Sequence, residues 1–145
     1  MKFVNIVWYL GIILFSMILI TGCMDTSSQP VVVIKPVDGS MISFNESDNG
    51  KVFEIPRNTE FFVNVTESYA TGTKWHPKVS SGLELLDDGY YADPKSLRPD
   101  IGGTRSWKLQ ATGTGQQSFQ ADFYQFSDSD KVQQRYALTF KIRPG

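Results

Sequence analysis

A period-two alternation of apolar and polar residues recurs along this chain, and it limits the folds that are open to it. In residues 136–142 every second side chain is apolar, namely Tyr136, Leu138, Phe140 and Ile142. The same alternation occurs in residues 62–66, 106–111 and 118–123. Successive side chains of a strand point to opposite faces, so this pattern predicts sheets with one buried face.

Eight strand-like runs, rich in β-branched and aromatic residues and bounded by Gly, Pro, Asn or Asp, follow one another from Val31 onward. They are Val31–Lys35, Met41–Phe44, Lys51–Ile55, Glu60–Thr66, Thr73–Val79, Thr104–Ala111, Gln117–Tyr124 and Arg135–Ile142. This spacing predicts an all-β, immunoglobulin-like sandwich of about seven to eight strands. We expect Trp75 and Trp107 at the centre of its core. A helix fits only in Leu83–Asp87 or Lys95–Arg98.

Composition excludes several classes of protein. The 14 Lys and Arg residues nearly balance the 15 Asp and Glu residues, so the chain lacks the excess positive charge of a nucleic-acid binder. Its 41% hydrophobic and 13% aromatic content is too high for a disordered chain. One Cys and one His cannot form an internal disulfide or a structural zinc site. A length of 145 residues favours a single folded domain.

The N-terminal segment has the pattern of an export signal. Lys2 is followed by an almost wholly apolar run from Ile6 to Ile20. The tetrad Ile20-Thr21-Gly22-Cys23 resembles the lipobox of prokaryotic lipoproteins, which implies cleavage before Cys23 and a lipid on its sulfur. An uncleaved membrane anchor is the alternative.

We therefore expect an exported chain held at the outer face of the cytoplasmic membrane or at the cell surface. Residues 1–22 would be the lipoprotein signal peptide. Residues 23–30 would be the lipidated Cys and a polar tether, and residues 31–145 the immunoglobulin-like domain.

Catalytic motifs are scarce. His76, between Trp75 and Pro77, is interpreted as a surface residue at a strand end rather than a general base. Asp87-Asp88 before Gly89 is typical of a turn. Asp128-Ser129-Asp130 lacks the Gly and the closing Glu of a calcium loop, so a polar hairpin tip is favoured. Nothing in the sequence indicates catalytic activity or calls for a metal or cofactor.

Three connecting segments carry the remaining information, since loops on a rigid β scaffold are common sites of binding. They are Ser68–Trp75, Pro99–Thr104 and Gln125–Lys131.

These segments resemble the loops of the chagasin family of cysteine-protease inhibitors. Thr71, Gly72 and Trp75 match the family's first motif, N-P-T-T-G-aromatic-x-W, whereas Ser68, Tyr69, Ala70 and Thr73 depart from it. Gly102, Gly103, Thr104 and Trp107 match the second motif, and Asp100 replaces its first Gly. Gly115 and Phe123 fit the third region, but Gln125-Phe126-Ser127 stands in place of the triplet R-P-aromatic.

The resemblance implies an immunoglobulin-like, monomeric, reversible inhibitor whose three loops, at one end of the sandwich, enter the cleft of a papain-like cysteine protease. In the family the first loop covers the catalytic Cys and the other two clasp the sides. Phe126 could supply an aromatic contact. The implied protease-binding residues are Tyr69, Ala70, Thr71, Gly72, Thr73, Asp100, Ile101, Gly102, Gly103, Thr104, Gln125, Phe126 and Ser127.

Two other functions remain open on the residues alone. A cell-surface binding or adhesion module with no protease target would use exposed aromatic side chains such as Tyr90, Tyr91 or Phe126. An enzyme would depend on His76.

Overall fold

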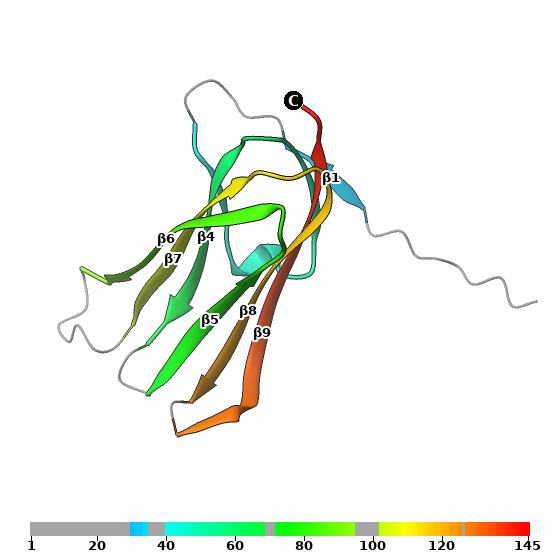
Figure 1. Ribbon diagram of the computed structural model, residues 1–145. Coiled ribbons are helices and arrows are strands. Elements are labelled where there is room, and N and C mark those ends of the chain that lie inside the picture. The colour runs from blue at the N-terminus through cyan, green and yellow to red at the C-terminus, as the bar shows by residue number, and fades with distance from the viewer. Residues whose placement is uncertain (1–29, 35–39, 69–71, 95–101, 126) are drawn as a thin grey trace, which may run out of the picture.

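A computed structural model describes residues 30–34, 40–68, 72–94, 102–125 and 127–145. In this part the chain forms two β-sheets packed face to face, which confirms the expected all-β sandwich (Figure 1). The elements are β1 Val31–Val33, β2 Ile42–Phe44, the 3-10 helix η1 Glu46–Asp48, β3 Val52–Pro56, β4 Glu60–Glu67, β5 Thr73–Val79, β6 Leu83–Ala92, β7 Gly103–Ala111, β8 Gly115–Gln125 and β9 Asp128–Arg143.

The predicted signal peptide, the lipidated Cys23 and the tether before Pro30 lie outside the described residues. Within the described ranges, no helix is both long and apolar enough to cross a membrane.

The two sheets have the strand orders β1-β3-β9-β8-β5 and β2-β4-β7-β6. Strands β1 and β3, β3 and β9, and β2 and β4 pair in parallel, while the other neighbours are antiparallel. Strand β5 is therefore an edge of the first sheet and β6 an edge of the second. Proline has no backbone N–H to donate to a neighbouring strand. An edge strand has a neighbour on one side only, which explains how Pro77 fits inside β5.

The core lies between the sheets and is rich in aromatic rings. Phe44 contacts Phe53, Phe61 and Phe140 at centroid distances of 4.6, 5.6 and 5.3 Å. Trp107 is fully buried, which confirms its expected place. Trp75 is also buried, at 3% exposure. The alternating runs bury their apolar faces as predicted, so this core supplies the stability of the sandwich.

Strand β6 corrects the sequence interpretation, which allowed a helix at Leu83–Asp87 and a turn at Asp87–Gly89. Both stretches belong to this extended strand, which is shifted in register by a bulge between Leu85 and Asp87. Only Leu83 is buried in it, so the strand shows no alternation of buried and exposed side chains. The other segment that could have been helical, Lys95–Arg98, lies outside the described residues.

The hairpin of β8 and β9 is longer than the sequence indicated. The expected loop Gln125–Lys131 is mostly strand, because β9 begins at Asp128. Register shifts near Tyr124 keep the two strands paired up to Gln125. Residues 131–135 of β9 are all exposed, so no alternation of buried and exposed side chains marks this part of the strand.

Candidate functional site

Three connections leave the sandwich at the same end: β4–β5, β6–β7 and β8–β9 (Figure 1, lower left). Glu67, the last residue of β4, pairs with Gly103, the first residue of β7. Gly103 also pairs with Ala92, which ends β6. In the other sheet, Thr73 at the start of β5 pairs with Gln125 at the end of β8. The strand ends that flank the three sequence-predicted loops therefore lie at one end of the sandwich, and the C-terminus lies at the opposite end.

The structure separates the predicted binding residues into loop tips and loop stems. Six of them, Tyr69, Ala70, Thr71, Asp100, Ile101 and Phe126, lie outside the described residues. Thr73 is buried at the start of β5, so it belongs to a stem. Thr104, Gln125 and Ser127 are exposed at the same end of the molecule. Gly72 and Gly102 are the described ends of the first and second loops.

Glycine is required in these loops for two different reasons. Gly72 has a φ of +63° and Gly102 a φ of +102°, which L side chains rarely adopt, and there is open space beside each. Gly103 is constrained by space instead. A Cβ at this position would lie 2.5 Å from the carbonyl oxygen of Tyr91 and 2.6 Å from the phenol ring of Tyr90.

A buried ion pair lies at the base of the first two loops. The Arg105 guanidinium donates from Nη2 to Glu67 Oε1 over 2.6 Å and from Nε to Glu67 Oε2 over 3.1 Å. The Arg105 Nη1 atom donates to Asp88 Oδ1 over 2.9 Å. The Trp75 backbone N–H donates to Glu67 Oε2 over 3.2 Å. Four strands therefore meet at one charged cluster, and we call its Glu67–Arg105 contact the stem ion pair.

Sequence reasoning missed the stem ion pair, although the alternation contained a signal for it. Arg105 falls on the same stripe as Trp107 and Leu109, which face the core. Glu67 falls on the stripe of Val63 and Val65. Opposite charges on two core-facing stripes predict a buried pair once the two strands are known to be neighbours.

Trp75 closes the first loop as well as filling the core. Its indole Nε1 donates to the carbonyl oxygen of Thr66 over 2.9 Å, and its ring lies 4.8 Å from that of Phe123. The indole thereby ties the start of β5 to the end of β4, which fixes both ends of the loop between them.

The sequence predicted His76 at a strand end, but it lies in the middle of β5, on the outer face of its sheet. Its ring stacks on that of Tyr124, with centroids 4.2 Å apart and planes 9° apart. Burial, with the positive charge of Lys74, lowers the pKa of the imidazole. Its Nε2 atom has no hydrogen-bond partner among the described residues. A neutral, stacked imidazole of this kind is a packing group.

Asp122 lies beside His76 on the same face and is 1% exposed. Arg135 Nε donates to its carboxylate over 2.7 Å and Lys78 Nζ over 2.8 Å. The hydrogen bond from Arg135, against the opposing effect of burial, lowers the pKa of this carboxyl. This cluster clamps β5, β8 and β9 together behind the third loop.

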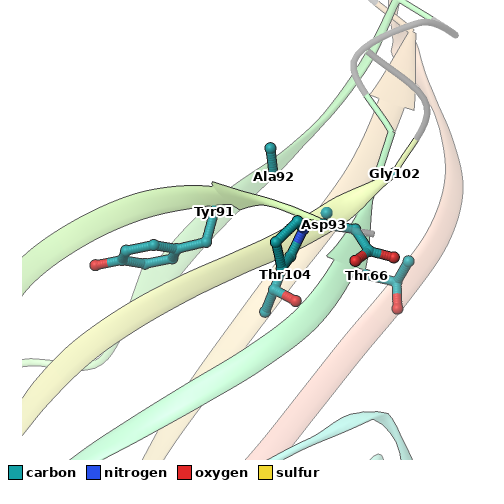
Figure 2. A pocket seen from close by; sticks show the side chains of 8 residues that line it. Thr66, Tyr91, Ala92, Asp93, Gly102 and Thr104 are labelled. Atoms are coloured by element: carbon teal, nitrogen blue, oxygen red, sulfur yellow. The ribbon is translucent and has the colours of Figure 1, made fainter. Parts of the chain in front are cut away.

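A pocket of about 430 Å³ opens beside the second loop (Figure 2). The residues that line it include Thr66, Tyr91, Asp93 and Thr104. Tyr91 is 60% exposed. Such a lining offers hydrogen bonds and an aromatic surface, which suits the side chain of a binding partner.

The described residues hold no cluster of three or more His, Cys, Asp or Glu side chains that could hold a metal ion. What the described part of the loop end offers is main-chain groups and hydroxyls on paired strands. These features are suited to recognition of another macromolecule.

Comparison with known proteins shows which proteins share this architecture. The model of the Chagasin family peptidase inhibitor I42 matches residues 54–142. The cysteine protease inhibitor EhICP2 from Entamoeba histolytica is similar in fold, with a TM-score of 0.61 at 14% identity over 78% of this chain and 97% of that one.

Amebosin is similar in fold too, with a TM-score of 0.62 at 20% identity over 72% of this chain and 100% of that one. No curated protein matches the sequence significantly.

Proposed function

This chain belongs to the chagasin family of peptidase inhibitors, and from this we propose its function. We propose that it is a reversible inhibitor of papain-like cysteine proteases. Three loops from one end of the sandwich would fill the active-site cleft. The observation that carries the proposal is the convergence of the β4–β5, β6–β7 and β8–β9 connections at that end.

The stems explain why such a wedge would bind well. Each loop starts and ends on a paired strand, and the stem ion pair and Trp75 hold the first two. Loops whose two ends are already held in place lose less conformational entropy on docking than loops with free ends.

Each loop would have its own contact. Residues 69–72 would cover the catalytic Cys of the protease, and the buried Thr73 would support them from the stem. Residues 100–104 would lie along one wall of the cleft through their main chain, and residues 125–127 along the other, with Phe126 as an aromatic anchor. The pocket beside Thr104 would receive a side chain from the rim of the cleft.

The test is a titration of papain with the domain that begins at Met24, which contains every strand of both sheets. The parent domain is expected to give stoichiometric, reversible loss of activity on a fluorogenic peptide. Gly72→Glu is expected to abolish that inhibition. Gly115→Glu is the matched control, because Gly115 also has a positive φ of 79° and open space, but lies where β8 pairs with Ile142 at the far end.

Full inhibition by Gly72→Glu would rule out the first loop as the wedge. No inhibition by the folded parent domain would favour the alternative, a cell-surface binding module, with the exposed Tyr91 as its first contact to test.

We also propose that the domain acts outside the cytoplasmic membrane as a monomer anchored by a lipid at Cys23. The tetrad Ile20–Cys23 and the apolar run before it support this location. Cys23→Ser is expected to abolish lipid attachment, measured by the mass of the membrane-extracted protein. An unchanged mass would contradict lipidation.

A further inference from the structure

We propose that Glu67 and Arg105 are positioning residues that join the first and second loops into one rigid recognition unit. This inference rests on the proposed function, in which both loops contact the same protease. Neither residue is assigned to that contact, since both are buried beneath the loops.

The Glu67 carboxylate fixes the two ends of the first loop. Glu67 is the residue before that loop, and its Oε2 atom accepts a hydrogen bond from the Trp75 backbone N–H just after it. The separation across the loop is therefore set by one side chain. The Trp75 indole adds a second tie to the Thr66 carbonyl.

The Arg105 guanidinium does the same for the second loop. Arg105 lies two residues into β7, directly after that loop, and Nη1 donates to Asp88 on β6, the strand before it. The guanidinium carbon also lies 5.7 Å from the centre of the Tyr90 ring on β6. The other two guanidinium nitrogens, Nε and Nη2, donate to Glu67, so each loop is tied to the other through the same two side chains.

The burial of this pair favours positioning over stabilisation as its role. The side chains of Arg105 and Glu67 are 5% and 0% exposed. Taking two charges out of water costs much of what their attraction returns, and an apolar pair of similar size is often as stable. A two-point contact between guanidinium and carboxylate does fix orientation, which apolar packing does not do.

Breaking the pair should therefore weaken inhibition more than it weakens the fold. In Glu67→Gln the side chain keeps its shape and an oxygen for the Trp75 N–H, but it loses one acceptor for Arg105. The two loops then move independently in the free inhibitor. Because more conformational entropy is lost when they become ordered on the protease, the affinity falls by about tenfold or more.

The experiment compares the parent domain with three variants. These are Glu67→Gln, the apolar double variant Glu67→Leu/Arg105→Met, and Phe140→Leu as a core control. Each is measured for inhibition of papain, for its melting temperature, and for hydrogen exchange at the Trp75 amide. The apolar double variant keeps the proposal testable if Glu67→Gln does not fold.

The expected result is at least tenfold weaker inhibition and faster Trp75 exchange in both stem variants. Phe140→Leu should inhibit like the parent despite a lower melting temperature. Stem variants that inhibit like the parent would overturn the inference. A loss of inhibition in Phe140→Leu as large as that in a stem variant with a similar melting temperature would overturn it too.

The exchange measurement separates the two proposals. If the folded parent does not inhibit papain, the proposed function fails for this protease, while Trp75 exchange still reports whether the stem ion pair holds the loop. Unchanged exchange in Glu67→Gln and in the double variant would then overturn the positioning role by itself.

Discussion

Replacing Gly103 with Ala tests how closely the two stems of the second loop approach each other. The added Cβ would lie 2.5 Å from the Tyr91 carbonyl oxygen and 2.6 Å from the Tyr90 ring. Ordinary van der Waals contacts start at 3.4 Å, so β6 and β7 must separate by about 1 Å at this point. The nearest atom belongs to the main chain and cannot rotate away.

The size of the effect follows from this overlap. Forcing one extra carbon into a tightly packed position costs about 1–3 kcal/mol. For a domain of this length, each kcal/mol lowers the melting temperature by about 4 °C. Gly103→Ala is therefore expected to melt about 4–12 °C below the parent domain. Thermal unfolding of both is followed by circular dichroism. Inhibition of papain should weaken as well, because the second loop is displaced.

Gly89→Ala is the matched control in the same pair of strands. Its Cβ would lie 3.0 Å from the Tyr91 ring, a side chain that is 60% exposed and free to swing aside. We expect a change within about 0.5 kcal/mol, or about 2 °C. If Gly103→Ala melted within 2 °C of this control, the close approach of the strands would not be what requires glycine.

Two further predictions concern the frame behind the loops. Phe140→Ala removes a fully buried ring that contacts Phe44 and Phe61, so it should cost about 3–5 kcal/mol by chemical denaturation; a cost below about 1 kcal/mol would contradict the packed aromatic cluster. Asp122→Asn should cost about 1–2 kcal/mol at pH 7. Arg135 lowers the pKa of Asp122 below its unfolded value of about 3.9, so its ionised carboxylate stabilises the fold above that pH. That contribution is lost as the pH falls through the lower pKa, and the gap between the variant and the parent should close there; a gap independent of pH would count against the ion pair.

The sequence was most informative where a strand has one covered face. In β7 the side chains of Trp107, Leu109 and Ala111 alternate inward as expected, and β4 places Val63 and Val65 in the same way. Burial of one face imposes a period of two on the residues, so the pattern of the sequence carries the architecture.

The sequence was least informative where a strand has no buried face, or where only part of the strand is buried. In β6 only Leu83 is buried, and in β9 residues 131–135 are all exposed, so polar residues such as Asp87 and Gln133 are as acceptable there as apolar ones. The stem ion pair was missed for another reason. Whether Glu67 and Arg105 meet depends on β4 lying beside β7, a pairing between distant segments that no local pattern determines.

The matches to the family's loop motifs have structural causes in this chain. Gly72 and Gly102 have positive φ angles, Gly103 has no space for a Cβ, and Trp75 and Trp107 are buried. The matched glycines and tryptophans therefore reflect how loops are set on the sandwich rather than which surface they meet. The departures lie mainly in the first and third loops, and among the described ones Gln125 and Ser127 are exposed whereas Thr73 is buried. We infer that the frame is shared with the family and that the choice of protease is decided at the departing positions that do not support a stem.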